Sequence, residues 1–197
     1  MISATMLTDL FGDSSIAPCI IDRLAISSRI TVSDKGDMIY EAGIQKAGEM
    51  IFLRKGLVRT YIYKADGSEF TDGFAYNPGQ LLHGYTEGLP LHPLNIESLK
   101  RTEVVRIPYT AVEEILSLYP DFYKILLGWM AEILNRSMEE RIMMQNSTAL
   151  ERLRWLQHYY PGLIETAPNG YIASFLNMTP VTLSRMRGKL REGKEGR

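Results

Sequence analysis

The sequence contains Tyr171-Ile-Ala-Ser-Phe-Leu-Asn177, directly followed by Met178-Thr-Pro-Val-Thr-Leu-Ser-Arg-Met-Arg-Gly-Lys-Leu190. Asn177 stands between two short amphipathic segments, and asparagine tolerates the left-handed backbone that a tight turn requires. Thr179 can cap the following helix through its hydroxyl, and Pro180 suits the first helical position, where its missing N–H is no loss. The stretch therefore predicts a helix-turn-helix with a cationic second helix, which is a DNA-binding motif.

The two faces of this second helix differ in chemistry. At about 100° per residue, Leu183, Met186 and Leu190 share one side, which we expect to face the core. Arg185 lies on the opposite side, where a guanidinium in the major groove can bond guanine O6 and N7. An ordinary helical hairpin with a solvated basic face is the alternative. The residues expected to contact double-stranded DNA are Val181, Thr182, Ser184 and Arg185 at the bases, and Thr179, Arg187 and Lys189 at the phosphates.

The charge of the chain is unevenly distributed. The 197 residues carry a net charge of −1. Residues 148–197 contain eight Lys/Arg and four Asp/Glu, a balance of +4, whereas residues 1–147 contain fourteen and nineteen, a balance of −5. A positive balance around the helix-turn-helix is what binding to phosphates requires. Because no apolar run has the length of a membrane span and no signal-peptide pattern is found, we expect a cytoplasmic protein without a membrane partner.

The composition also excludes several chemistries. Cys19 is the only cysteine, which rules out an intramolecular disulfide, a cysteine-rich zinc site and a four-cysteine iron–sulfur cluster. The histidines His83, His92 and His158 do not form a recognised metal-binding pattern. The sequence contains no Walker loop, nucleophile elbow or Ser-His-Asp order. We therefore expect neither an enzyme nor a bound cofactor or metal.

Short strands punctuated by turns are predicted between about residues 28 and 108. Turn signals such as Asp66-Gly67 and Asn77-Pro-Gly79 separate them, and no helical pattern intervenes. Many short strands at near-regular spacing are typical of an antiparallel barrel or roll. The candidate strands are Arg29–Val32, Met38–Tyr40, Met50–Arg54, Leu57–Tyr63, Glu69–Tyr76, Leu94–Leu99 and Val104–Ile107.

The pattern becomes helical after Pro108. We expect a short helix over Tyr109–Leu118, a long one over Asp121–Asn146, and a third over Ala149–Tyr160. The third helix and the helix-turn-helix should form a compact three-helix unit. The fold class is therefore α+β, with a β-roll sensor domain and flanking helices in residues 1–120, a dimerisation helix in 121–147 and a winged helix-turn-helix in 148–197.

The long helix is expected to hold two copies of the chain together. At 26 residues it would measure about 39 Å, more than a small roll can cover. Packing on its own roll is the alternative, but the length favours burial against a second copy. The stripe expected at the interface consists of Leu127, Met130, Leu134, Ser137, Arg141 and Met144.

The order of roll, long helix and helix-turn-helix resembles the bacterial regulators typified by the cyclic AMP receptor protein and the fumarate and nitrate reduction regulator, the Crp/Fnr regulators. The resemblance rests on Gly36-Asp-Met-Ile-Tyr-Glu-Ala-Gly43, on Phe52-Leu-Arg-Lys-Gly-Leu-Val58, and on the helix-turn-helix segments, with Thr179-Pro-Val-Thr-Leu-Ser-Arg185 similar to the recognition helix. It covers the chain from about residue 20. It implies a jelly roll of the cyclic-nucleotide-binding type and dimeric, effector-controlled regulation of transcription, with RNA polymerase as a candidate partner.

The chain departs from the cyclic-nucleotide-binding members of that family. His92 and Pro93 stand where those members have an Arg followed by Ser or Thr. A neutral histidine and a proline cannot supply a bidentate cation and a hydroxyl to a cyclic phosphate, so we expect no cyclic AMP binding. A structural role for His83 or His92 is favoured over haem ligation. The residues that could surround an unidentified small-molecule effector, or simply fill the roll, are Tyr76, His83, Tyr85, His92 and Asn95.

A rival function from another class is a signalling or scaffold module. Its roll would bind a ligand or a protein partner, and its terminal helices would not bind DNA. Salt-dependent binding to duplex DNA distinguishes the two functions, because phosphate contacts release counterions.

Overall fold

The computed structural model describes residues 2–12, 16–43, 48–86 and 94–195, with side chains described up to Arg191. The contacts divide the chain into two compact units, each described separately below. The N-terminal unit comprises residues 1–60 and 74–133, and the C-terminal unit comprises residues 61–73 and 134–197. The tip of one β-hairpin and the second half of the long helix therefore group with the C-terminal helices.

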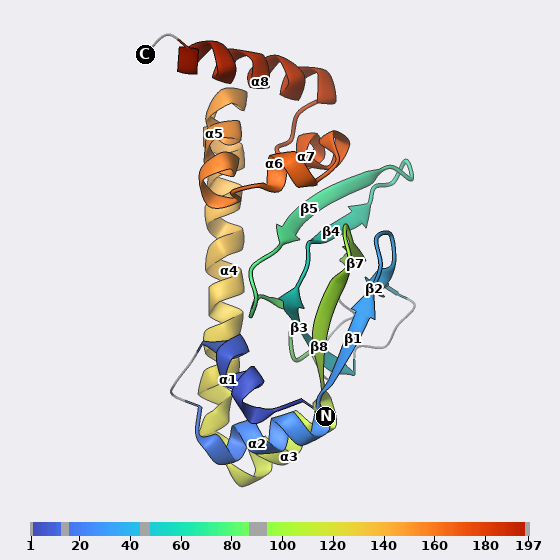
Figure 1. The fold of residues 1–197 in the computed structure, drawn as a ribbon, viewed down its shortest axis with the longest axis vertical. Coiled ribbons are helices and arrows are strands. Elements are labelled where there is room, and N and C mark those ends of the chain that lie inside the picture. The colour runs from blue at the N-terminus through green and yellow to red at the C-terminus, as the bar shows by residue number, and fades with distance from the viewer. Residues whose placement is uncertain (1, 13–15, 44–47, 87–93, 196–197) are drawn as a thin grey trace. The chain divides into compact units, whose positions relative to one another are not determined.

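The roll consists of two four-stranded sheets, in the orders β1-β8-β3-β6 and β2-β7-β4-β5 (Figure 1). The strand pairs β1–β8, β3–β8, β3–β6 and β2–β7 are antiparallel, as expected. The strands are β1 (Arg29–Ser33), β2 (Met38–Tyr40), β3 (Glu49–Lys55), β4 (Val58–Tyr63), β5 (Glu69–Ala75), β6 (Leu81–His83), β7 (Asn95–Ser98) and β8 (Thr102–Pro108).

Strand β3 separates two cores. Because successive side chains point to opposite faces of a sheet, Ile51 and Leu53 fill the inside of the roll, while Met50 and Phe52 face the helices. The helices of this unit are α1 (Ala4–Phe11), α2 (Pro18–Ser27), α3 (Tyr109–Leu118) and the first half of α4 (Tyr123–Asn146). The aromatic rings of Phe11 and Trp129 lie 5.1 Å and 5.2 Å from that of Phe52. The centre of β3, from Met50 to Leu53, is apolar without interruption because both of its faces are buried there.

The C-terminal unit is helical apart from the hairpin tip of β4 and β5. Its helices are the second half of α4, α5 (Ala149–Tyr159), α6 (Leu163–Thr166), α7 (Asn169–Phe175) and α8 (Pro180–Glu195). A capping box fixes the start of α5: Thr148 accepts from the Glu151 N–H, and the Glu151 carboxylate accepts from the Thr148 N–H. The core of the three-helix arrangement contains Leu153, Leu156, Ile172, Leu176, Leu183 and Met186.

Several elements differ from the sequence-based expectation. Strand β6 was not expected, because its three residues are held by pairing with β3 rather than by a local pattern. Helix α6 forms between the predicted helix Ala149–Tyr160 and the helix-turn-helix, where no helix was predicted. The sequence analysis predicted a β-wing beside the helix-turn-helix, and the structure corrects this prediction. Described residues 148–195 contain no strand, and the short link between α5 and α7 folds as α6. Among the helices of the described residues, none combines the length and the apolar composition needed to cross a bilayer.

Candidate nucleic-acid interface

The turn between α7 and α8 has the geometry that the sequence predicts. Asn177 adopts a left-handed backbone with φ of 49°. The Thr179 hydroxyl accepts a 3.1 Å hydrogen bond from the Thr182 N–H, and Pro180 is the first residue of α8. Arg152 of α5 donates to the Asn177 carbonyl at 3.3 Å. The start of α8 is therefore fixed by its cap, and the turn before it is tied to α5.

Helix α8 buries one side and exposes the other. Leu183 and Met186 are 1% and 6% exposed, and Leu190 is half-buried, as the helical period predicts. Val181, in the first turn of α8, is 79% exposed. Among the described side chains of α8, the exposed polar ones are Ser184, Arg185, Lys189 and Arg191, while Thr182 is partly buried. The outer side of α8 thus offers a cation, a hydroxyl and an apolar group to a partner.

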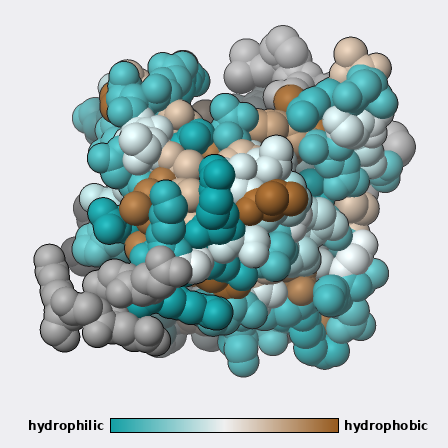
Figure 2. Space-filling model, turned by 90° about the horizontal axis from the view of Figure 1, so that it is seen from above, coloured by the Kyte–Doolittle hydropathy of each residue, from teal (hydrophilic) through white to brown (hydrophobic). Residues whose placement is uncertain are grey.

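Arg187, unlike exposed Arg185 and Lys189, forms a hydrogen bond within the fold. It is partly buried, and its Nη2 donates a 3.1 Å hydrogen bond to the carbonyl oxygen of Ile164 in α6. The phosphate contact expected from Arg187 stays a prediction, but this bond directs the guanidinium toward α6. Of the other expected phosphate contacts, Lys189 is exposed, and the Thr179 hydroxyl caps α8. On the face seen in Figure 2, hydrophilic residues predominate and apolar residues form small separate groups.

The residues expected around an effector are held by contacts within the roll. Buried His83 lies with its ring 4.7 Å from that of Tyr40 and its Nδ1 3.3 Å from the Tyr109 hydroxyl. Tyr109 also donates to the Gly84 carbonyl at 2.7 Å, and its ring lies 4.8 Å from that of Tyr85. These contacts are compatible with a packing role for His83 and Tyr85, and an effector contact of either residue stays a prediction.

Two of the remaining effector candidates, Tyr76 and Asn95, belong to the described residues. Buried Asn95 accepts a 3.0 Å hydrogen bond from the Ala42 N–H. Tyr76 is half-buried, and its N–H donates to the Gln80 side chain at 2.7 Å. His92 lies outside the described residues. The grouping of these residues around an effector therefore stays a prediction.

Sequence reasoning missed one charged residue of the roll. Arg59 of β4 is 1% exposed, and its Nη1 lies 3.3 Å from the Glu97 carboxylate of β7. An arginine is almost never fully buried unless it is paired. The position of Arg59 inside a predicted strand with apolar neighbours indicated that it could be buried. Nothing in the sequence indicated that Glu97 is its partner.

Helix α4 exposes a continuous apolar stripe. None of its residues is fully buried. Leu127 and Leu134 are 61% and 59% exposed, and Met130 is also exposed. Met138 and Ile142, which the heptad-like spacing did not select, continue the stripe because the apolar residues recur every four positions in this half. Of the other expected interface residues, Arg141 is exposed and Met144 is half-buried.

Comparison with known proteins shows which proteins this chain resembles. No family model matches the chain. Over 169 residues the chain is 22% identical to the fumarate and nitrate reduction regulatory protein of Escherichia coli K12, covering 80% of this chain and 67% of that protein. The chain resembles the Crp/Fnr regulators in sequence and in fold. FixK2 from Bradyrhizobium japonicum has the same fold, with a TM-score of 0.72 and 21% identity over 85% of this chain and 86% of that one.

A second solved structure extends the likeness to more of the chain. The c-di-GMP-responsive global regulator CLP of Xanthomonas campestris has a TM-score of 0.69 and 15% identity over 90% of this chain and 93% of that one. As in these Crp/Fnr relatives, the chain combines a jelly roll, a long helix and a helix-turn-helix. The resemblance read from the sequence motifs is confirmed.

Proposed function

We propose that the chain is a transcription regulator that binds double-stranded DNA as a homodimer. The observation that carries this proposal is the arrangement of α8, which buries Leu183 and Met186 while exposing Val181, Ser184 and Arg185 on its outer side. A recognition helix requires this combination, since one side must hold the fold and the other must reach base edges. The regulatory relatives support the proposal.

The exposed residues of α8 divide into two roles. Arg185 reads a guanine through O6 and N7, with Ser184 beside it and Val181 placed to meet a thymine methyl. Lys189 contacts a backbone phosphate, which positions the helix without reading sequence. Because Thr179 caps α8 and Arg187 bonds to Ile164, these two residues contribute to DNA binding mainly by holding α8 in place.

The dimer forms through the apolar stripe of α4. A helix of 24 residues, about 36 Å long, with no buried residue and five exposed aliphatic or methionine side chains along one side, needs a partner surface. A second copy of α4 supplies one with the same chemistry around a two-fold axis. The two recognition helices then lie about 34 Å apart, on successive major grooves.

The roll acts as the sensor in this proposal. Its ligand is a small molecule other than cyclic AMP, since His92 and Pro93 occupy the positions of the phosphate-binding pair. A regulator of transcription acts on RNA polymerase, which is therefore the further partner in this proposal. The protein acts in the cytoplasm, where it encounters both DNA and the polymerase.

Selection from a pool of random duplexes tests the proposal. The full chain should enrich sequences with two inverted half-sites whose centres are about 10–10.5 base pairs apart. Val181→Ala should relax the preference at one base pair of each half-site. Enrichment of no sequence above the starting pool would favour the alternative, a scaffold module whose terminal helices bind no DNA.

A further inference from the structure

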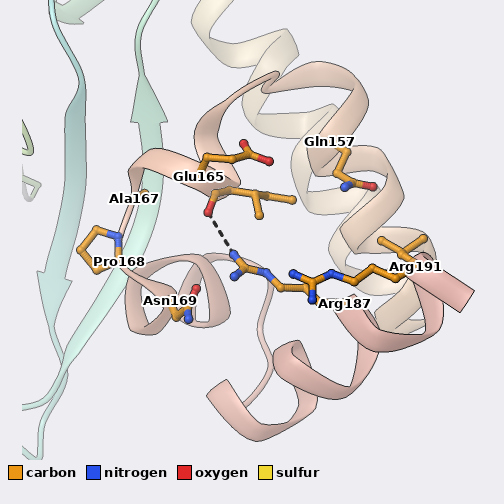
Figure 3. A pocket seen from close by; sticks show the side chains of 9 residues that line it. Gln157, Glu165, Ala167, Pro168, Asn169, Arg187 and Arg191 are labelled. Atoms are coloured by element: carbon orange, nitrogen blue, oxygen red, sulfur yellow. Dashed lines mark hydrogen bonds between the residues drawn. The ribbon is translucent and has the colours of Figure 1, made fainter.

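A hollow with a volume of about 630 Å³ lies between α5, the segment from α6 to the start of α7, and the last turns of α8 (Figure 3). We call it the α8 hollow. Its polar lining comes from Gln157, Glu165, Asn169, Arg187 and Arg191. All of these residues belong to the C-terminal unit. The volume is in the range of small-molecule sites in proteins.

Arg187 brings an unused donor to the α8 hollow. While its Nη2 bonds to the Ile164 carbonyl, its Nε is buried and has no hydrogen-bond acceptor among the described residues. Buried donors of a charged group are nearly always satisfied, by protein, water or a ligand. The fixed Nη2 also holds the guanidinium in one orientation, so an acceptor that enters the hollow meets a preorganised fork.

Arg191 brings a second guanidinium to the same place. It lies one turn beyond Arg187, and Figure 3 shows both side chains extending along the hollow. Like charges four residues apart destabilise a helix slightly, and an anion bound between them would offset that repulsion. Glu165 is the one carboxylate of the lining, and neither arginine forms an ion pair with the side chains that the structure describes. The lining thus carries one positive charge in excess.

We propose that the α8 hollow is a binding site for a small oxyanion, a phosphate ester or a carboxylate. Two guanidinium groups match the planar, multidentate geometry of such anions, and the Asn169 and Gln157 amides can supply neutral hydrogen bonds. At 100° per residue, Arg187 and Arg191 lie about 160° and 120° around the helix from Arg185. The anion therefore occupies a side of α8 different from the one assigned to the bases.

Thermal unfolding of the full chain with inorganic phosphate tests this site. Phosphate at ten times its dissociation constant should shift the unfolding equilibrium about elevenfold toward the folded state, relative to sodium chloride of equal ionic strength. Arg191→Gln should abolish the phosphate-specific shift; because Arg191 is exposed, its loss leaves the packing intact. Arg187→Gln should abolish it as well. Lys189→Gln removes the same charge from the same helix outside the hollow and should retain the full shift.

Three outcomes would overturn the proposal. Equal stabilisation by phosphate and chloride would show that the hollow has no anion site, and equal loss of the shift in Lys189→Gln would show that only the net charge matters. A DNA-binding measurement distinguishes a site for a free anion from a site for a phosphate of the DNA backbone. Arg191→Gln should leave the salt dependence of duplex binding unchanged. A slope reduced by about one would assign the hollow to a DNA phosphate instead and contradict a free-anion site.

Discussion

The backbone N–H of Thr71 in β5 donates a 2.9 Å hydrogen bond to the Ser174 hydroxyl in α7, across 103 residues of sequence. Thr71 is fully buried. The bond fixes the tip of the β4–β5 hairpin to the first helix of the helix-turn-helix. Since β4 and β5 continue into the roll, each of these two strands contributes residues to both units.

Replacing Ser174 with alanine should destabilise the C-terminal unit. The change leaves the buried Thr71 N–H without its acceptor, which costs about 1–3 kcal/mol of unfolding free energy. Urea unfolding measures the loss, and amide hydrogen exchange at Thr71 should accelerate. Ser184→Ala is the matched control, because that serine is exposed on α8, and it should change stability by less than about 0.5 kcal/mol. Unchanged exchange at Thr71 in Ser174→Ala would contradict the bond.

Glu140 should make the stability of the C-terminal unit depend on pH. Burial raises the pKa of the Glu140 carboxyl above its ordinary value of 4.5, with Asp72 and Glu139 adding to the rise; a hydrogen bond from the Tyr160 hydroxyl and the nearby Arg136 oppose it. Because the folded-state pKa is raised, the protonated form favours folding. This stabilisation is fully present below about pH 4.5 and is lost as the pH rises through the raised pKa.

The variant Glu140→Gln isolates this effect, since glutamine cannot ionise but can still accept from Tyr160. Unfolding free energies measured from pH 4 upward should fall more steeply with pH in the wild type than in Glu140→Gln. Glu139→Gln removes the exposed neighbouring carboxylate and should keep most of the wild-type slope. Parallel curves for the wild type and Glu140→Gln would refute the raised pKa.

Arg185 and Lys189 should differ in their effect on sequence preference. Arg185→Ala should weaken binding to the selected operator by about 1–3 kcal/mol, because a bidentate base contact is lost. Lys189→Ala should weaken binding to the operator and to random DNA to a similar degree, because a phosphate contact carries no sequence information. Competition titrations at one salt concentration compare the two. An unchanged ratio of operator to random binding in Arg185→Ala would remove its base-reading role.

Charges in the α4 stripe should separate the dimer. Met130 lies close to Gly84 of its own roll, so Leu134 and Met138 are the cleaner positions to change. Replacing both with glutamate would bury like charges across the two-fold axis and should give monomers in light scattering. The exchange Leu134→Met with Met138→Leu keeps the apolar surface and should remain a dimer. A folded double-glutamate variant that stays dimeric would place the interface elsewhere.

Cyclic AMP and cyclic GMP should not bind the roll with useful affinity. The sequence resemblance aligns His92 and Pro93 with the arginine and the hydroxyl residue that hold a cyclic phosphate, and neither can replace them. Isothermal calorimetry with either nucleotide should show no saturable heat up to millimolar concentration. Saturable binding in the micromolar range would show that another part of the roll supplies the missing contacts.

Local chemistry made much of this fold predictable. The left-handed Asn177, the Thr179 cap and the buried side of α8 follow from neighbouring residues alone, and so does the short helix Tyr109–Leu118. The apolar stripe of α4 was predicted in part. Its continuation through Met138 and Ile142 was missed because a strict heptad was imposed on a helix whose apolar spacing changes to four.

Nonlocal contacts account for what the sequence could not predict. Strand β6 exists through pairing with β3, and the Thr71–Ser174 bond joins residues far apart in the chain. Burial of Arg59 depends on Glu97 in another strand. The contact of Arg187 with Ile164 depends on α6, which forms in a stretch that is flanked by proline and glycine residues. Each of these features requires the tertiary structure to bring its partners together.

The salt dependence of duplex binding tests the central claim most directly, because a protein that contacts phosphates must release counterions. Equilibrium binding of the full chain to its selected operator should weaken linearly in log–log form as salt increases, with a slope of about −0.9 for each phosphate contacted. Lys189→Ala should reduce the magnitude of that slope by about one. Binding that is absent, or that does not change between 50 and 200 mM salt, would contradict a DNA-binding role for α8.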